Sequence, residues 1–373
     1  MIRSVEELKD LKGVRVLLRA SLNVPMQEGT VSDATRLTCA LPTIEFLMKK
    51  GARIILMSHM SDSMGSLRPV FDHFKKQLPL TFVDDVAGVA AHTAASALKD
   101  GHILLLENIR RNAGEKANDI QFARELASLG DIFVNDDFTV AHRKHAGVVL
   151  LPTLLPSYAG LRFLEEMNGL LPALSPESPS LAILGGAKLS TKMALLTKLL
   201  EKYDHVFVGG ALSNDFFAAK GYETGKSLVS GMSVAGGLLG NSKIILPDIV
   251  TIASAHDHHD GHASELAPGD IISDIAIPSI KALQPLIDKA RFILWNGPMG
   301  NFEAGFVAGT DDLAERIASA KGKSIVGGGD TLSSIQNLGV EEKFTFVSTA
   351  GGAMLDFLAS GTLPGIEALE VRH

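Results

Sequence analysis

The sequence has 373 residues but only one cysteine, Cys39. A single thiol excludes a disulfide framework and any cysteine-based metal cluster, and it fits the reducing cytoplasm, where we expect this protein to act. Basic residues are not in excess either, because 35 Lys and Arg face 42 Asp and Glu. The formal net charge of -7 argues against a nucleic-acid partner, so an anionic ligand must be held by local arginines.

Long hydrophobic runs are also missing. The longest apolar stretch extends from Val148 to Leu155, is interrupted by Pro152, and is far shorter than the roughly 20 residues that span a bilayer. The N-terminal segment MIRSVEELKD contains no apolar region of the kind found in export signals. We therefore expect no membrane partner.

Short runs rich in Val, Ile and Leu recur along the chain, and each is followed by a helix-like stretch. Strands buried on both faces of a parallel sheet have this composition. The alternation of strand and helix predicts the α/β class, with parallel sheets wound on both faces. The expected strands are residues 14–18, 54–57, 103–106, 132–134, 181–184, 206–208, 244–246, 292–295, 324–326 and 344–347.

The length of the chain and its hydrophobic fraction of 46% are too large for one core and sufficient for two. The segment 151–160 contains two prolines and a glycine, an amphipathic helix-like stretch follows, and SPESPS at 175–180 breaks the chain again. The expected parts are a first domain over residues 1–158, a linker helix over 159–176, a second domain over 177–355 and a C-terminal segment over 356–373.

The 36 glycines of the sequence are concentrated at the ends of the expected strands in the second half. Ligands bind at the carboxyl ends of parallel strands, where a backbone without side chains lets helix N-terminal amides approach a phosphate. Any one of these turns could be a plain tight connection, but four together favour a nucleotide site. They are Gly185-Gly186, Gly209-Gly210, Gly327 to Gly329 and Gly351-Gly352.

The standard nucleotide motifs are nevertheless absent. The segment GYETGKS at 221–227 imitates a Walker A loop, but it has one residue too few between its glycines and follows a helical stretch, so we interpret it as a turn. No Gly-x-Gly-x-x-Gly motif opens a βαβ unit at the amino end, which argues against a dinucleotide oxidoreductase.

A series of segments, in the same order as in the family, resembles the motifs of the phosphoglycerate kinase family. The resemblance implies an enzyme that reversibly transfers a phosphoryl group between 1,3-bisphosphoglycerate and ADP, giving 3-phosphoglycerate and ATP, with Mg²⁺ as cofactor. The matching segments are RASLNVP (19–25), SDATRL (32–37), LMSH (56–59), LLENIR (105–110), VNDDF with AHRKHAG (134–147), GGAKLSTK (185–192), WNGPMGNFE (295–303), GGGDT (327–331), STAGGA (348–353) and LPGIEAL (363–369).

The family's fold consists of two doubly wound, Rossmann-like α/β domains joined by a helix, and its C-terminal segment packs back on the N-terminal domain. By resemblance, the N-terminal domain would hold the phosphoglycerate and the C-terminal domain the Mg-nucleotide. The resemblance also implies a cleft that closes by hinge motion to exclude water, and a monomer.

For the nucleotide, the resemblance implies that Lys188 is catalytic, that Lys192 contacts phosphates and that Asp330 binds Mg²⁺. The two lysines are four residues apart at the start of an expected helix, which places them on one face. Asp330 could also serve as a helix N-cap. The implied nucleotide-binding residues are Gly185, Gly186, Lys192, Gly209, Gly210, Asn296, Pro298, Glu303, Gly327, Gly328, Gly329, Asp330 and Thr331.

For the acceptor, the resemblance implies a basic patch in which Arg36 is catalytic and reaches the transferring group. Guanidinium groups suit this task because their fork binds phosphate or carboxylate through two hydrogen bonds. The implied substrate-binding residues are Ser21, Asn23, Arg36, His59, Asp62, Arg110 and Arg143.

The sequence departs from the family pattern mainly in this patch. Ser21 stands where the family usually has an aspartate, and Asp62 stands where an arginine normally helps to hold the substrate phosphate. Asp137 and Thr139 occupy positions that are usually small. Because a carboxylate would repel a bound phosphate, we expect Asp62 to point elsewhere or its loop to be remodelled.

These departures leave two alternatives to a phosphoglycerate kinase. The chain could be a kinase of the same fold with another small carboxylate as acceptor, or a nucleotide-binding regulator whose acceptor site has decayed.

The histidine-rich segment 256–262 is interpreted as a solvated hairpin in preference to a metal site.

Overall fold

The computed structural model describes residues 2–187, 189–231, 234, 236–254 and 257–370. Lys188 and His256 therefore lie outside the described residues. The chain divides into two compact units, one formed by the residues up to Asn168 with the segment from Thr362, and the other by Gly169–Gly361. No helix among the described residues combines the length and the apolar character needed to cross a membrane.

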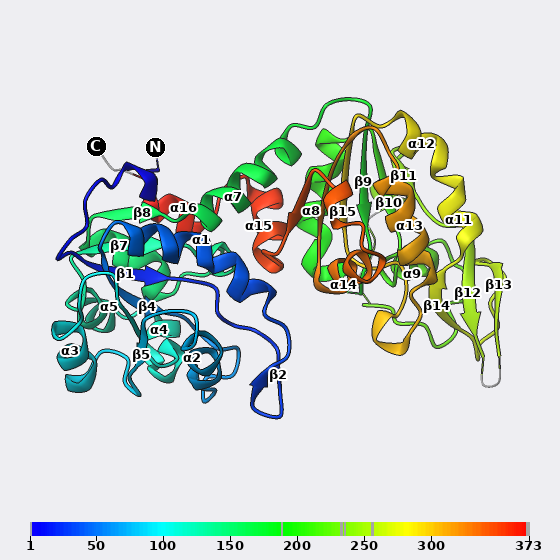
Figure 1. The fold of residues 1–373 in the computed structure, drawn as a ribbon. Coiled ribbons are helices and arrows are strands. Elements are labelled where there is room, and N and C mark those ends of the chain that lie inside the picture. Colours follow the sequence, from blue (N-terminus) through cyan, green and yellow to red (C-terminus); the bar gives the residue numbers. More distant parts are fainter. Residues whose placement is uncertain (1, 188, 232–233, 235, 255–256, 371–373) are drawn as a thin grey trace. The chain divides into compact units, whose positions relative to one another are not determined.

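The first unit is built on a parallel sheet of six strands (Figure 1). Its central strand β1 (Arg15–Arg19) pairs with β4 on one side and with β7 on the other. The chain thus leaves the centre of the sheet in both directions, which creates a crevice at the carboxyl ends of β1 and β7. In spatial order the strands are β5 (Leu80–Phe82), β6 (Ile103–Leu105), β4 (Arg53–Met57), β1, β7 (Ile132–Asn135) and β8 (Ser157–Ala159).

Successive residues of β1 enter different cores, because neighbouring side chains on a strand point to opposite faces. Val16 and Leu18 pack in one cluster with α1, whereas Leu17 packs in another with α5. The sheet is therefore covered on both faces, as the sequence predicts. The unit's helices are α1 (Thr35–Lys49), α2 (Arg68–Phe74), α3 (Val89–Ser96), α4 (Ala113–Ala117), α5 (Ile120–Ala127), α6 (Leu151–Leu154), most of α7 (Leu161–Leu170) and α16 (Pro364–Leu369), with the short turns η1 (Val5–Glu7), η2 (Ile109–Arg111), η3 (Phe138–Val140) and η4 (Ala146–Leu150) and a hairpin of β2 (Met26–Gln27) and β3 (Thr30–Val31).

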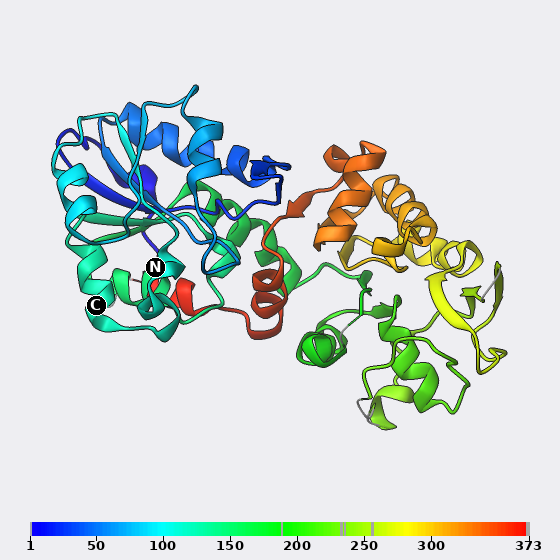
Figure 2. The ribbon, with the colours of Figure 1, turned by 90° about the horizontal axis from the view of Figure 1, so that it is seen from below.

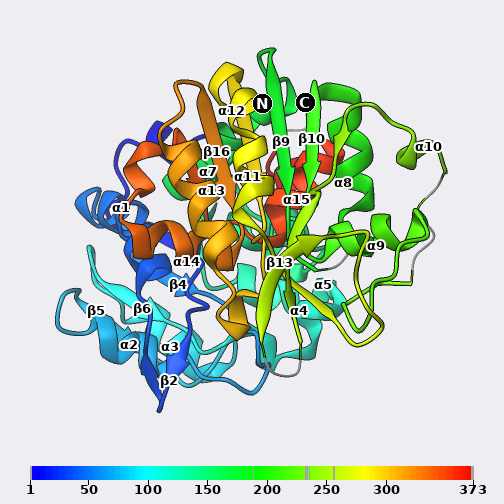
Figure 3. The same cartoon turned by 90° about the vertical axis from the view of Figure 1, so that its right-hand side faces the viewer.

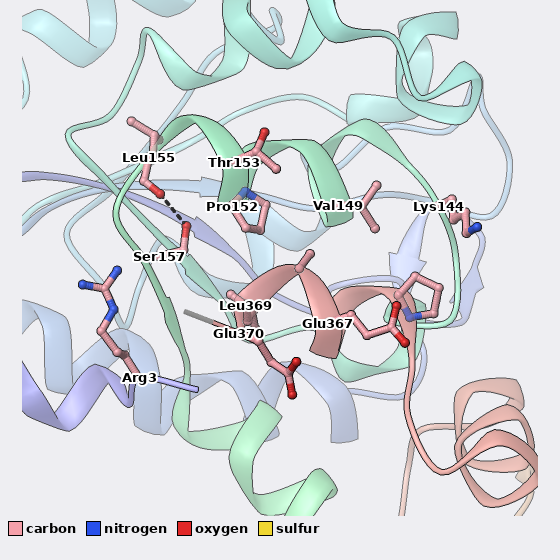
Figure 4. Close-up of a pocket in the computed structure, with 12 residues that line it drawn as sticks. Arg3, Lys144, Val149, Pro152, Thr153, Leu155, Ser157, Glu367, Leu369 and Glu370 are labelled. Carbon is pink, nitrogen blue, oxygen red and sulfur yellow. Dashed lines mark hydrogen bonds between the residues drawn. The ribbon is translucent and has the colours of Figure 1, made fainter. Parts of the chain in front are cut away.

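The C-terminal segment belongs to this first unit, which confirms the prediction that it packs back on the N-terminal domain. Helix α16 lies beside η4, α6 and β8 (Figures 1 and 2) and buries Leu363, Ile366 and Leu369. The amide of Gly365 donates to the carbonyl of Ala141 at 2.8 Å, so α16 supports the loop that carries Arg143. A cavity of about 610 Å³ remains between α16 and α6 (Figure 4).

The second unit contains another parallel sheet of six strands. When its strands are numbered by their order along the chain, they lie side by side in the order 3-2-1-4-5-6. This order is found in dinucleotide-binding folds. The chain reverses direction across the sheet between β9 and β15, where such folds place their ligand. The strands are β11 (Ile244–Ile245), β10 (His205–Val208), β9 (Ser180–Leu184), β15 (Phe292–Asn296), β16 (Lys323–Gly327) and β17 (Phe346–Ser348).

Helices α11, α12 and α13 of the second unit pack against one another (Figure 3). An antiparallel sheet of β13 (His258–His262), β12 (Ile249–Ala253) and β14 (Ile271–Ile275) is inserted before them. Strand β13 pairs with β12 and is largely exposed, in agreement with the predicted solvated hairpin. The unit's helices are α8 (Leu189–Lys202), α9 (Leu212–Ala219), α10 (Gly236–Leu239), α11 (Ile277–Ala282), α12 (Gln284–Lys289), α13 (Ala308–Ala318), α14 (Gly329–Leu338) and α15 (Gly352–Ser360), with the turns η5 (Leu171–Leu174), η6 (Phe302–Ala304) and η7 (Glu341–Lys343).

Candidate active site

In the first unit, predicted substrate residues meet beyond the carboxyl ends of β1 and β4. Arg36 stands in the first turn of α1 and donates from Nη1 to the carbonyl of Asn23 at 2.7 Å. The Asn23 side chain in turn exchanges two hydrogen bonds with Ser61, at 2.8 and 3.0 Å. These contacts fix the loop after β1 against the loop after β4 and hold the Arg36 guanidinium at their junction.

Arg110 provides a buried positive charge beside these loops. Its side chain is only 7% exposed, and one terminal nitrogen donates to the carbonyl of Met60 at 3.3 Å. Its Nε and Nη2 have no hydrogen-bond partner in the described part of the chain. Burial lowers the pKa of Arg110 to about 10, and the charges of Arg143 and Arg19 add to this effect. A buried cation with free donors fits a bound anion.

Arg19 and Glu115 form a fully buried ion pair of 2.9 Å beneath the same region. Glu115 also accepts the amide of Gly147 at 2.7 Å, so its carboxylate is well satisfied. His145 lies 3.8 Å from Glu115, and burial lowers the pKa of His145 to about 4, so this histidine is neutral at physiological pH. Sequence reasoning did not include Arg19, Glu115 or His145 in the site.

Asp137 is a second fully buried carboxylate in this region. It follows β7 and lies 3.5 Å from Nδ1 of His59 and 3.9 Å from Nε of Arg19. Burial alone would raise the pKa of Asp137, but the hydrogen bond from His59, with further help from the charge of Arg19 and from Thr139, holds this pKa well below its usual range. Asp137 is therefore ionised. The sequence analysis singled it out as a departure but did not place it in the site.

The side chain of Asp62 is exposed, and its Oδ1 accepts the amide of Met64 at 2.9 Å. Its carboxylate is thus engaged by the backbone of its own loop. The side-chain Nδ2 of Asn108 holds this loop by donating to the carbonyls of Asp62 and Gly65, each at 3.0 Å. The sequence led us to expect that Asp62 points elsewhere or that its loop is remodelled, and the carboxylate is found bonded within its own loop.

In the second unit, a cavity of about 370 Å³ lies at the carboxyl ends of the strands. Of the predicted nucleotide residues it collects five, which are Gly186, Gly210, Pro298, Glu303 and Asp330. The other predicted ones do not line it, namely Gly185, Lys192, Gly209, Asn296, Gly327, Gly328, Gly329 and Thr331. The lining residues that sequence reasoning missed are Ala187, Ala211, Leu228, Ile271, Ile272, Ser273, Asp274, Met299, Gly300, Asn301 and Phe302.

Backbone segments approach one another so closely beside this cavity that two turns require glycine. A Cβ on Gly185 would lie 2.2 Å from the carbonyl oxygen of Pro298. Gly210 has a φ of +58°, and its Cβ would lie 2.6 Å from the amide nitrogen of Gly186. The buried Trp295 packs in the core, and its Nε1 donates to the carbonyl of Gly297 at 3.0 Å.

Lys192 lies beneath the glycine turns and is 8% exposed. Its ammonium donates to the carbonyl of Gly185 at 2.5 Å and to Oδ1 of Asn296 at 3.2 Å. Burial lowers the pKa of Lys192 to about 8. The lysine therefore ties the end of β9 to the end of β15, and its contact with a nucleotide phosphate stays a prediction.

The cavity offers carboxylate oxygens from Asp330, in the first turn of α14, and from Glu303. Within the described residues, no three His, Cys, Asp or Glu side chains are grouped so that they could hold a metal ion. One or two carboxylates suit Mg²⁺ bound together with a nucleotide, because Mg²⁺ keeps several waters and takes phosphate oxygens as further ligands. These donors therefore fit a magnesium-nucleotide site.

The close approach at Gly210 gives a testable prediction. Gly210→Ala should raise the Kd for Mg-ADP at least tenfold, because the new Cβ strains a left-handed turn and displaces the amide of Gly186. Isothermal titration calorimetry would measure this change. Gly237→Ala is the matched control, since nothing lies within 4 Å of its Cβ position. Unchanged ADP affinity of Gly210→Ala would contradict the role of this turn.

Comparisons with known proteins cover nearly the whole chain. The model of the family described as phosphoglycerate kinase matches residues 5–361. The phosphoglycerate kinase of Methylorubrum extorquens (strain PA1) is 40% identical, with 99% of each chain covered, and that of Bradyrhizobium diazoefficiens is 43% identical, with 97% of each covered. The solved structure of phosphoglycerate kinase from Coxiella burnetii superposes with a TM-score of 0.85 at 34% identity over 99% of both chains, and that from Pyrococcus horikoshii OT3 with a TM-score of 0.86 at 29% identity over 99% of this chain and 98% of that one.

The family match agrees with the strand order of the second sheet and with the groups that line the two sites. The chain therefore belongs to the phosphoglycerate kinase family, whose members are phosphotransferases with a carboxyl group as acceptor and act in glycolysis.

Proposed function

We propose that this chain catalyses the reversible, Mg-dependent transfer of a phosphoryl group between 1,3-bisphosphoglycerate and ADP. The buried guanidinium of Arg110, with two nitrogens that no described residue engages, carries the proposal. Burying an unpaired cation costs free energy unless a bound anion compensates its charge. Phosphoglycerate is such an anion, and the same observation argues against a decayed acceptor site.

In the first unit, the proposed ligand contacts are Arg110, Arg143 and His59 for the anionic groups, with Asn23 positioning the loop. Arg36 is proposed to meet the transferring phosphoryl group, where a guanidinium fork can neutralise charge spread over the equatorial oxygens. Transfer requires the two ligands to meet away from water, for which we propose a hinge movement of the domains.

In the second unit, the glycine turns are proposed to bind the nucleotide through their backbone amides. Asp330 is proposed to hold Mg²⁺, and Glu303 and Pro298 to border the nucleoside. When bound, Mg²⁺ supplies charge neutralisation to the phosphates. Lys192 would orient the ends of β9 and β15, and Lys188, which lies outside the described residues, is proposed as a further cation for the transferring group.

The test is ATP-dependent phosphorylation of 3-phosphoglycerate by purified protein in Mg²⁺, with ADP release followed by a coupled assay. We expect turnover that requires both Mg²⁺ and 3-phosphoglycerate. A panel of other small carboxylates serves as the comparison. Turnover with one of them and not with 3-phosphoglycerate would favour the same-fold kinase with another acceptor, and Mg-ADP binding without any turnover would contradict the kinase.

We also propose that the enzyme works as a monomer in the cytoplasm. The monomer follows from the resemblance to the family, and the lone thiol of Cys39 fits a reducing compartment. Sedimentation velocity across the concentration range of the activity assay measures the oligomeric state. A dimer whose dissociation removes activity would contradict the monomer.

A further inference from the structure

Three side chains of the first unit form a chain of hydroxyls ending in a buried carboxylate. Thr139 donates from Oγ1 to Oδ1 of Asp137 at 2.5 Å. The Oγ of Ser21 lies 3.4 Å from Oγ1 of Thr139. Ser21 and Thr139 are half-buried, whereas Asp137 is inaccessible to solvent. The three residues therefore run from the crevice at the carboxyl end of β1 into the interior.

The register of the sheet explains why these residues meet. Arg19 of β1 and Asn135 of β7 are direct partners in the parallel pair. Ser21 and Asp137 each follow two residues after this pair, so they occupy corresponding places beyond two adjacent strands. Ser21 stands where the family motif has an aspartate, and Asp137 brings a carboxylate to the neighbouring strand.

The direction of each hydrogen bond follows from the ionised carboxylate. Because Asp137 can only accept, the hydroxyl proton of Thr139 points to it. The Thr139 oxygen is then left as an acceptor, so the proton of Ser21 points to Thr139. The lone pairs of Ser21 remain for a donor from outside the chain. The serine is thereby fixed as an acceptor in the region of the predicted basic patch.

A hydrogen-bond acceptor among positively charged donors is selective for a ligand that carries a hydrogen-bond donor. The carboxylate and phosphate of 3-phosphoglycerate are acceptors at neutral pH and are matched by Arg110, Arg143 and His59. The C2 hydroxyl is the substrate's only hydrogen-bond donor under these conditions. We propose that Ser21, Thr139 and Asp137 form a relay that takes the place of the single carboxylate of the family motif and recognises the C2 hydroxyl of the acceptor.

The relay rests on the proposed function and deepens it, because it assigns one feature of the substrate to Ser21, Thr139 and Asp137. Ser21 would touch the substrate. Thr139 and Asp137 would act as positioning residues, since their effect passes through Ser21. Asp137 also lies within 4 Å of both Arg19 and His59, so its replacement would disturb these two side chains. Thr139→Val is the cleaner change because it removes one hydroxyl and leaves the carboxylate.

The test compares two ligands by calorimetry with the full chain: 3-phosphoglycerate and 3-phosphonooxypropanoate, the analogue without the C2 hydroxyl. We expect the wild-type protein to bind 3-phosphoglycerate at least tenfold more tightly than the analogue, because a site built to pair with a hydroxyl rejects a ligand that lacks it. Thr139→Val should weaken 3-phosphoglycerate about tenfold and leave the analogue within about twofold. Adding Ser21→Asp to Thr139→Val should restore the discrimination, since it returns a carboxylate to position 21.

Thr153→Val is the matched control. The Thr153 hydroxyl donates to the carbonyl of Leu150 at 2.7 Å and borders the cavity beside α16 (Figure 4), so this variant should bind both ligands as the wild type does. Equal weakening of both ligands by Thr139→Val, or no recovery with Ser21→Asp, would overturn the relay. A wild type that phosphorylates 3-phosphoglycerate without discriminating against the analogue overturns the relay alone, whereas a wild type that binds neither ligand also overturns the proposed function.

Discussion

Replacing Arg36 with alanine should lower kcat for the phosphorylation of 3-phosphoglycerate by about 10³-fold or more, the scale seen when an arginine that neutralises a transferring phosphoryl group is lost. The bond from Nη1 to the carbonyl of Asn23 fixes the guanidinium at 2.7 Å and leaves its other nitrogens for phosphoryl oxygens. Asp33 accepts the amide of Thr35 at 2.8 Å, which sets the start of the helix that carries Arg36. Steady-state kinetics with saturating Mg-ATP would measure the loss.

Two further variants separate a catalytic loss from a general one. Arg36→Lys should recover only a small part of the rate, because an ammonium keeps the charge but not the planar fork. Arg68→Ala is the matched control, since Arg68 is an exposed arginine of α2 that faces Asp72 at 3.8 Å, and its kcat should stay within twofold of the wild type. The Kd for Mg-ADP should not change in any of them. An Arg36→Ala enzyme with more than a tenth of the wild-type kcat would remove Arg36 from the proposed role.

The buried strands of both parallel sheets could be predicted from the sequence because each is a continuous apolar run. All ten expected strands are present with shifts of one or two residues at their ends. Strands β5 and β8, at the two edges of the first sheet, were missed because of their composition. β5 is only half-buried, and β8 reads Ser-Tyr-Ala, so neither has the composition of a strand covered on both faces.

The antiparallel sheet was missed for a related reason. Strand β12 alternates between half-buried and buried residues, a period of two that a search for continuous apolar runs passes over. Its partner β14 supplies Ile271, Ile272, Ser273 and Asp274 to the cavity of the second unit. A wall built by an inserted sheet has no motif near the glycine turns, so sequence reasoning could find the turns but not this side of the cavity.

The basic patch contains residues that short sequence motifs identify and others that they do not. Motifs identified Arg36 and Arg110 because each lies in a recognisable segment. The buried carboxylates of this region come from elsewhere in the chain, and Glu115 pairs with Arg19 across 96 positions of sequence. Such a pairing is decided by how α4 packs against the sheet. The available signal was Asp137 itself, a charged residue two positions after the end of the buried strand β7.

Glu115→Ala should lower the free energy of unfolding of the first unit by about 3 to 5 kcal/mol, the usual cost of leaving one partner of a buried ion pair uncompensated. Glu115 and Arg19 are both inaccessible to solvent, and the variant also removes the acceptor of the Gly147 amide. Urea unfolding followed by far-UV circular dichroism would measure the change, and hydrogen exchange would locate it at β1 and β7. The exposed pair of Glu45 and Lys49, 3.7 Å apart, provides the control, because Glu45→Ala should cost less than 1 kcal/mol.

Two further variants distinguish the effect of an unpaired charge on Arg19 from a simple loss of packing around Glu115. Glu115→Leu keeps the side-chain volume but still strands Arg19, so it should be nearly as unstable as Glu115→Ala. Adding Arg19→Met removes the stranded charge, and the double variant should regain part of the lost stability, since an apolar pair of similar volume can replace a buried ion pair. Trp295 is the only tryptophan, is fully buried in the second unit, and gives a fluorescence signal for that unit in the same titration. A double variant no more stable than Glu115→Leu would mean that the carboxylate supports the fold through Gly147 and the packing of α4, and not by neutralising Arg19.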